Sequence, residues 1–366
     1  MARAHNFNAG PAVLPVSVLM ELQGAILEYG GTGMGIMEMS HRSKPFEAIL
    51  NSAVERLKRV MGIPSDYRVL FLQGGASLQF YMTALNLLGP GERADYVVTG
   101  VWAKKALAEA KRVGDAAAAW DGKSINYNQL PIEGGYAIRD DAAYVHYTTN
   151  NTIYGTQWPS LPYHDGRPLV ADMSSDIASR PVDVAAHELI YAGAQKNLGP
   201  SGVTVVILSP WAVQKSKDVA AARGGLPSML DYGLFLADNS LYNTPNTWGI
   251  FALERVLNWV EEQGGPSAIA AANQKKADTL YAELDRTGFW RPHVAGIARS
   301  QMNIPWRAPS EELEAKFVKE SEAGGFRGLK GHRSVGGIRA SMYNALPQES
   351  VDALVSFMRD FEQKNG

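Results

Sequence analysis

The sequence contains no cysteine, and this absence excludes several kinds of chemistry. The chain can form no disulfide bond, offers no thiolate nucleophile and has no cysteine ligand for a metal ion. The absence also fits a reducing compartment. Any covalent catalysis must therefore come from another nucleophile.

A strong net charge is also lacking, since 35 Lys and Arg residues nearly balance 37 Asp and Glu residues. Attraction of the whole chain to nucleic acid or to an anionic membrane is not expected, so any anion site must come from a local cluster. No apolar run approaches the length of a membrane span, and the first residues lack the apolar core of a signal peptide. We therefore expect a cytoplasmic protein that binds neither nucleic acid nor membrane.

The apolar runs that are present predict an α/β fold. Near-continuous β-rich runs recur through the middle of the chain, and helical segments fit between several of them. This pattern is typical of a mostly parallel sheet, here of seven strands, with helices on both faces. The expected strands are Arg68–Leu72, Tyr96–Thr99, Ala116–Trp120, Tyr144–Thr148, Leu169–Asp172, Leu189–Ala192 and Val203–Leu208.

We divide the chain into three parts: an irregular arm over residues 1–15, a large domain over 16–258 and a smaller α+β domain over 259–366. Pro11 and Pro15 disfavour regular structure in the arm. A loop-rich stretch is expected over 210–247. The expected helices are 16–29, 45–61, 77–88, 103–112, 248–262, 266–286, 310–323 and 347–363.

Lys196 is the most informative residue of the chain. It ends an apolar run among small residues, and Asp172 ends an earlier run. Ligands of α/β sheets bind at the carboxyl ends of the strands, so both side chains are expected at one edge. Pyridoxal phosphate chemistry needs such a pair, because the amine forms a Schiff base with the cofactor aldehyde and the carboxylate keeps the pyridinium nitrogen protonated.

Three further residues follow predicted strands: Trp102, Thr152 and Gln195. A tryptophan there can stack on a flat ring, and the threonine hydroxyl can bond a cofactor. Taken alone, each reads more simply as a core, turn or surface residue, as does Lys196. Together with Asp172 they make five unusual residues at one sheet edge, which the simpler interpretation does not explain.

A phosphate site is predicted where Gly74-Gly75-Ala76-Ser77 follows a strand and opens a helix. Small residues let backbone N–H groups approach an anion at the helix N-terminus. For this motif alone, a plain turn with Ser77 as helix cap is an equally good interpretation. The second glycine-rich loop, at 30–35, is not a dinucleotide motif, because Ile36 takes the third glycine's place and the loop follows a helix.

Two basic pairs remain, His41-Arg42 and His332-Arg333. Arginine offers a planar fork for a carboxylate or phosphate, and histidine adds a donor. Each pair alone would more often be ordinary surface charge. A cleft between the two domains would bring the pairs together.

With these residues in view, the chain resembles the phosphoserine aminotransferases, a class-V family among the fold-type I pyridoxal phosphate enzymes. The resemblance covers nearly the whole chain. The matching strings are Phe7-Asn8-Ala9-Gly10-Pro11-Ala12, Ser40-His41-Arg42-Ser43, Gln73-Gly74-Gly75-Ala76-Ser77, Asp172-Met173-Ser174-Ser175, Tyr191-Ala192-Gly193-Ala194-Gln195-Lys196-Asn197, Tyr242-Asn243-Thr244-Pro245 and Gly331-His332-Arg333-Ser334.

The resemblance implies roles in binding the cofactor. Lys196 resembles the Schiff-base lysine, Asp172 the pyridinium partner, and Trp102 the residue that stacks on the ring. Thr152 resembles the threonine that contacts the side of the ring. The implied phosphate contacts are Ala76, Ser77 and Gln195, together with Asn243 and Thr244, which would reach the cofactor phosphate of the neighbouring subunit.

The resemblance also implies substrate contacts. Arg42 resembles the residue that binds the glutamate carboxylate. His41, His332 and Arg333 match residues around the substrate's carboxylate and phosphate. Two positions depart from the family pattern, which usually has glutamate at Asn151 and proline at Asn246. Both lie beside site residues, so they put subgroup and fine substrate preference in doubt rather than the reaction.

The implied activity is that of a homodimer with shared active sites, which transfers an amino group from L-glutamate to 3-phosphohydroxypyruvate. The products would be 2-oxoglutarate and phosphoserine, a serine precursor. Activity on the phosphorylated threonine precursor of vitamin B6 stays open.

Other functions on the same fold remain alternatives. One is a small-amino-acid:glyoxylate aminotransferase or a lyase, against which the two His-Arg pairs argue. Another is an inactive regulatory scaffold, against which the intact Asp172 and Lys196 argue. A cysteine desulfurase is excluded, because the chain has no cysteine.

Overall fold

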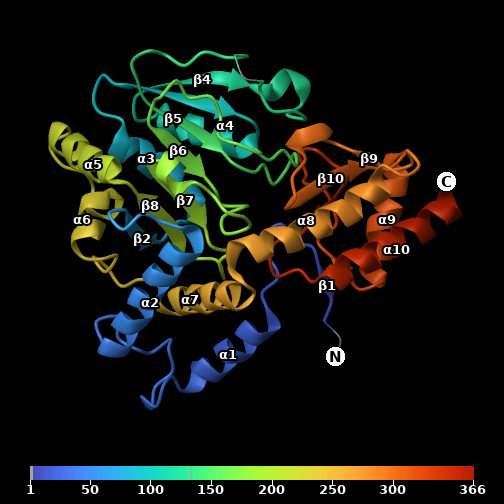
Figure 1. Cartoon of the computed structure of the whole chain (residues 1–366), viewed down its shortest axis with the longest axis horizontal. Coiled ribbons are helices and arrows are strands. Elements are labelled where there is room, and N and C mark those ends of the chain that lie inside the picture. Colours follow the sequence, from blue (N-terminus) through green and yellow to red (C-terminus); the bar gives the residue numbers. More distant parts are fainter. Residues whose placement is uncertain (1–2, 133) are drawn as a thin grey trace.

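The structure, a computed structural model, describes residues 3–132 and 134–366. One seven-stranded sheet forms the centre of the large domain, in the order β2-β8-β7-β6-β5-β3-β4 (Figure 1). Adjacent strands are parallel except around β8, which runs antiparallel to both of its neighbours. The strands are β2 Arg68–Leu72, β3 Arg93–Val98, β4 Asp115–Asp121, β5 Ala142–Thr148, β6 Leu169–Asp172, β7 Leu189–Gly193 and β8 Thr204–Leu208.

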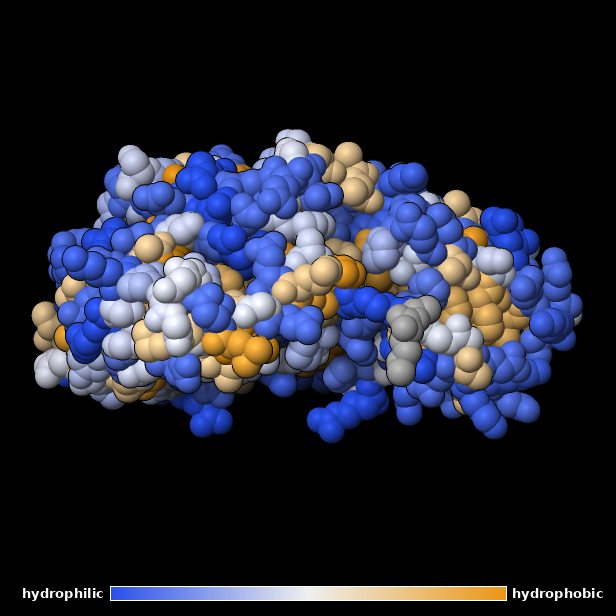
Figure 2. All heavy atoms as spheres, turned by 90° about the horizontal axis from the view of Figure 1, so that it is seen from below, coloured by the Kyte–Doolittle hydropathy of each residue, from blue (hydrophilic) through white to orange (hydrophobic). Residues whose placement is uncertain are grey.

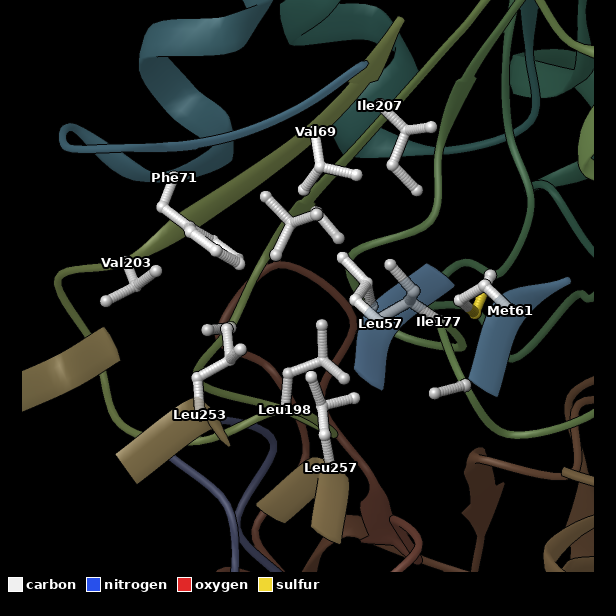
Figure 3. Close-up of a cluster of buried hydrophobic side chains, with 14 of the residues drawn as sticks. Leu57, Met61, Val69, Phe71, Ile177, Leu198, Val203, Ile207, Leu253 and Leu257 are labelled. Carbon is white, nitrogen blue, oxygen red and sulfur yellow. The ribbon is translucent and has the colours of Figure 1, made fainter. Parts of the chain in front are cut away.

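Helices cover both faces of this sheet, because successive residues of a strand point to opposite sides. Val69 and Phe71 of β2 pack in one core with α2 and α7, whereas Leu70 and Leu72 pack in a second core with α3 and α4. Figure 3 shows part of the first core, which includes Leu253 of α7. The helices of this domain are α1 Val16–Leu27, α2 Lys44–Met61, α3 Gly75–Leu87, α4 Val101–Ala110, α5 Pro210–Ala222, α6 Tyr232–Ala237 and α7 Thr247–Glu262.

The small domain packs three helices on a three-stranded antiparallel sheet with the order β12-β10-β9. A short parallel pair, β1 with β11, ties the N-terminal arm to this domain, and Phe7 is fully buried in its core. None of the helices formed by the described residues has the length and hydropathy needed to cross a membrane. The elements are β1 His5–Asn6, α8 Gly265–Leu284, β9 Arg291–Pro292, β10 Asn303–Arg307, α9 Glu311–Ala323, β11 Phe326–Arg327, β12 Ile338–Ser341 and α10 Gln348–Asn365.

The predicted α/β class, the seven strands and their mostly parallel arrangement are confirmed. The expectation of a loop-rich stretch over 210–247 is partly wrong, because α5 and α6 lie within it. Pro210 is not a break here, since proline is favourable in the first turn of a helix. Ser209 caps α5, its Oγ accepting a hydrogen bond of 3.0 Å from the Ala212 N–H.

Two smaller differences concern the arm and Trp102. The arm is irregular at Gly10-Pro11, yet His5–Asn6 pairs with β11 because the small domain offers an open strand edge there. Trp102 lies in the first turn of α4 rather than at a strand end. The boundary proposed at residue 258 falls inside α7, and the boundary remains a proposal.

The packing of α7 against the sheet leads to a test of the large-domain core. Leu253→Ala should lower the free energy of unfolding by about 2–5 kcal/mol, because this side chain is fully buried and its removal leaves a cavity. Urea unfolding followed by tryptophan fluorescence measures the loss. Ile297→Ala is the control, since Ile297 is 87% exposed and should change stability by less than about 0.5 kcal/mol. If both variants lost the same free energy of unfolding, the place of Leu253 in the large-domain core would be contradicted.

Candidate active site

A cavity of about 340 Å³ lies at the carboxyl ends of β5 and β6 and at the loop after β7. Eight of the predicted site residues line it, although they come from distant parts of the sequence. These residues are Ala76, Ser77, Trp102, Thr152, Asp172, Gln195, Lys196 and His332. The predicted sheet edge and the structure therefore agree on the location of one site.

Lys196 lies in the loop after β7, with its amine directed into this cavity. Its Nζ donates a hydrogen bond of 2.8 Å to Thr152 Oγ1 and lies 5.9 Å from the centroid of the Trp102 ring. Burial lowers the pKa of Lys196 from 10.5 to about 8; Asp172 opposes this shift and Arg339 adds to it. The neutral amine, which is the nucleophilic and basic form, is therefore well populated near pH 8.

Asp172 ends β6, the strand beside β7, and its carboxyl group is buried next to Lys196. Burial raises the pKa of this carboxyl, whereas Ser174 and the charge of Lys196 lower it. The Ser174 N–H donates a hydrogen bond of 2.9 Å to Asp172 Oδ1. A carboxylate held in this way can pair with a cationic group bound in the cavity.

The start of α3 forms one wall of the cavity. Gly74 and Gly75 have φ angles of 89° and 67°, which glycine adopts without strain. Gly74 has no side chain that could cap the helix, so the first N–H groups of α3 are free of a side-chain cap. With Ala76 and Ser77 lining the cavity, this helix end fits the predicted phosphate site.

The N-terminal arm lies against Lys196. A Cβ added to Gly10 would sit 3.4 Å from Lys196 Cγ, and the Ala12 N–H donates a hydrogen bond of 2.9 Å to the carbonyl of Gln195. Ala9 and Gly10 also line the cavity. The arm therefore packs against the side chain of Lys196.

Arg339 is a site residue that the sequence interpretation missed. It lies on β12, lines the cavity and is only 9% exposed. Its Nη1 donates a hydrogen bond of 3.1 Å to the carbonyl of Thr152, while its Nε has no partner among the described residues. A buried guanidinium with a free donor fits a carboxylate ligand. An arginine within the apolar strand Ile338–Ser341 was the signal available in the sequence.

Five predicted residues do not line this cavity. Arg333 lines a separate groove of the small domain, and His41 and Arg42 precede α2, where Arg42 is exposed. Asn243 and Thr244 precede α7, where the Thr244 carbonyl accepts a hydrogen bond of 3.1 Å from Gln73 Nε2. The cavity of one chain therefore contains only His332 of the two basic pairs, and the expectation that a cleft between the domains brings the pairs together stays a prediction. Their roles in binding remain predictions.

The two departures from the family pattern have clear local environments. Asn246 caps α7, since its Oδ1 accepts a hydrogen bond of 2.9 Å from the Gly249 N–H. Asn151 is buried, and its Nδ2 lies 2.9 Å from both Thr99 Oγ1 and Thr156 Oγ1. Neither residue lines the cavity.

Comparison with known proteins identifies the family. The class-V aminotransferase family model matches residues 4–354. A phosphoserine aminotransferase of Geobacillus kaustophilus is 52% identical over 365 residues, covering 100% of this chain and 99% of that protein. The solved phosphoserine aminotransferase of Bacillus circulans subsp. alkalophilus is 52% identical, with a TM-score of 0.95 over 100% of this chain and 99% of that one.

The chain belongs to the phosphoserine aminotransferases, within class V.

Solved structures below 25% identity share only the fold. An alanine–glyoxylate aminotransferase from Nostoc sp. has a TM-score of 0.74 at 17% identity, covering 99% of this chain and 96% of that one. Another phosphoserine aminotransferase, studied for radiation damage of its Schiff base, has a TM-score of 0.95 at 44% identity, covering 99% of this chain and 100% of that one. The glyoxylate-type alternative is thus supported by fold alone.

The cavity fits pyridoxal phosphate, the cofactor of class-V aminotransferases. Lys196 supplies an amine for the aldehyde, and Asp172 supplies a buried carboxylate for the ring nitrogen. The Trp102 indole has a buried Nε1 without a partner among the described residues and lines the space where a flat ring would lie. The start of α3 completes the fit with an anion site.

The lowered pKa of Lys196 can be measured in the cofactor-free protein. Its rate of acetylation, followed by mass spectrometry, should rise with pH and reach half of its maximum near pH 8, because only the neutral amine reacts. In the urea-unfolded chain the rise should continue toward the ordinary pKa of 10.5. In the folded protein, Asp172→Asn removes a charge that raises the pKa of Lys196, so the pH of half-maximal acetylation should fall. If the acetylation rate of Lys196 in the folded protein reached half of its maximum only near pH 10.5, the lowered pKa of this lysine would be contradicted.

Proposed function

We propose that this chain transfers the amino group of L-glutamate to 3-phosphohydroxypyruvate, giving 2-oxoglutarate and O-phospho-L-serine. The observation that carries the proposal is the cavity, which unites a partly neutral lysine, a buried carboxylate and a buried arginine with a free donor. The curated relatives named phosphoserine aminotransferase support the choice of substrates.

Pyridoxal phosphate, when bound, supplies an aldehyde that condenses with amines and a ring that accepts electrons from the substrate α-carbon. Asp172 would hold its ring nitrogen, Trp102 and Thr152 would flank the ring, and α3 would hold its phosphate. In this arrangement the chain's own contribution is orientation and proton transfer.

Lys196 Nζ is the group that moves the proton. Its pKa of about 8 lets it accept a proton from the α-carbon of the amino donor and return one to the acceptor. The hydrogen bond to Thr152 Oγ1 keeps the amine in the cavity when it is free. The arm at Gly10 limits access from the opposite side.

The small domain would bind the anionic groups of the substrates. Arg339 would bind the carboxylate next to the reacting carbon, because its guanidinium is buried beside Lys196. His332 lines the same cavity, where burial and the charges of Arg339 and Arg333 lower its pKa. A phosphate bound there would favour the protonated form of this histidine.

We also propose that the enzyme works as a homodimer with shared active sites. Helix α1 and the loop after it leave apolar side chains exposed, among them Leu27 (84%), Met20 (68%) and Met37 (64%). Figure 2 views the molecule from the side on which α1 lies and shows apolar residues among hydrophilic ones. A second subunit would cover them and would bring His41 and Arg42 to its partner's cavity.

Lys196→Ala tests the reaction. Wild-type holoenzyme should form glutamate from phosphoserine and 2-oxoglutarate. The variant should lose at least about a thousandfold in kcat, because Lys196 is the only lysine among the described residues that line the cavity. A coupled glutamate assay measures both. Lys104→Ala, an exposed change on α4, is the control and should keep the wild-type rate. Wild-type turnover of alanine but not of phosphoserine would overturn the proposed substrate.

Mixing two inactive variants tests the shared sites. One variant is Lys196→Ala and the other is Arg42→Leu, each expected to have little activity alone. In a hybrid dimer, one site would combine an intact Lys196 with the intact Arg42 of the other subunit, so part of the activity should return. Hybrids isolated with two affinity tags provide the measurement. If Arg42 served its own chain's cavity, no hybrid would recover activity.

A further inference from the structure

Lys276 is a buried lysine in the described part of the chain that the reaction does not use. It lies on α8 and is 2% exposed. Its Nζ donates to three successive carbonyl groups, those of Met342 (3.5 Å), Tyr343 (2.8 Å) and Asn344 (3.4 Å). Burial lowers its pKa to about 7, and no carboxylate of the described residues offsets that shift. The amine of Lys276 thus holds the turn that follows β12.

This turn contacts both segments that carry the reacting groups. The Asn344 N–H donates a hydrogen bond of 3.0 Å to Oδ1 of Asn197, the residue directly after Lys196. The Asn344 Nδ2 donates one of 2.9 Å to the carbonyl of Ala178, in the loop that follows Asp172. The turn therefore joins the small domain to the two loops of the large domain that leave β6 and β7.

The same turn also reaches the arm and the substrate site. The Tyr343 hydroxyl donates a hydrogen bond of 2.8 Å to the carbonyl of Ala9, beside the glycine that covers Lys196. Arg339 lies on β12 only a few residues before the turn, with its Nη1 on the carbonyl of Thr152. A displacement of the turn would therefore disturb three neighbours of Lys196: the Asn197 contact, the arm and Arg339.

We propose that Lys276 is a positioning residue, which holds the Met342–Asn344 turn so that the small domain keeps Arg339, the arm and the Lys196 loop in register. The proposal rests on the proposed function for its kinetic consequence. Its structural part, the setting of the environment of Lys196, is independent of the substrate. Asn273, one turn earlier on α8, supports the arrangement, since its Nδ2 donates to Asn344 Oδ1 at 2.9 Å.

A purely stabilising role is a weaker explanation of this lysine. A buried ammonium group is expensive to desolvate, and an apolar side chain of similar size would often stabilise a core at least as well. The three carbonyls, however, need a multiple donor at one point, which lysine provides. The buried amine of Lys276 is explained if the active site requires the Met342–Asn344 turn at one exact position.

Lys276→Met is the test, because methionine keeps an unbranched side chain that is one atom shorter and removes the donors. The matched control is Lys275→Met, an exposed change on the same helix. Two quantities are measured on each holoenzyme: kcat/KM for glutamate, and the pH at which the visible absorbance of the bound cofactor changes. Thermal unfolding is recorded in parallel, and the assays are run well below the unfolding temperature.

We expect Lys276→Met to lower kcat/KM on the order of tenfold, because misplacement of reacting groups by a fraction of an ångström is costly. The absorbance transition should move to higher pH, since Arg339 lowers the pKa at Lys196 and would lie less closely against it. Lys275→Met should leave both unchanged. A variant that loses only thermal stability, or a control that changes equally, would overturn the proposal.

If Lys276→Met does not fold, Asn344→Ala tests whether the Met342–Asn344 turn sets the environment of Lys196. It keeps Lys276 but removes the bonds to Ala178 and Asn273, so the same shift in the absorbance transition is expected. A wild-type transition in that variant would overturn the proposal. If wild-type enzyme does not act on phosphoserine, the proposed function fails, while the absorbance transition still tests Lys276.

Discussion

The opposite effects of burial on Lys196 and Asp172 are the constraint on which the site depends. Removal of water lowers the pKa of the amine and raises that of the carboxyl, and the attraction between the two groups limits both shifts. Parallel pairing of β6 with β7 places Asp172, at the end of β6, near the start of the loop that carries Lys196. The amine stays reactive near neutral pH only while the surrounding segments keep water out.

Those surrounding segments come from both domains, which explains why the small domain contacts the site at several points. The large domain supplies the lysine, the carboxylate and the N-terminus of α3. The small domain supplies the cations Arg339 and His332, together with the turn that bonds to Asn197. The arm is anchored in the small domain through β1 and Phe7, and it also covers Lys196. A shift of the small domain would therefore change solvent access and charge at the lysine at the same time.

Most of the sheet and half of the site could be predicted from the sequence, because both depend on local pattern. Continuous apolar runs marked the strands, and polar residues directly after them marked the cavity. Arg339 could not be recognised in this way, because its significance comes from β12 packing beside Thr152 across the domain boundary. Helix α5 was missed because the stretch over 210–247 was expected to be loop-rich, without the cap that Ser209 provides. The contacts of Lys276 likewise depend on a turn far away in the sequence.

The cavity of a single chain provides cations for a carboxylate but few for a second anionic group. Arg339 has a free donor and is committed to the region beside Lys196, while His332 carries a full charge only when it is protonated. A substrate with both a carboxylate and a phosphate needs more positive charge than this, since a buried anion without a partner is strongly disfavoured. Arg42 is exposed just before α2, and in the homodimer proposed above it would add positive charge from the second subunit. In the proposed homodimer, the second subunit would therefore be required for selection of a phosphorylated substrate.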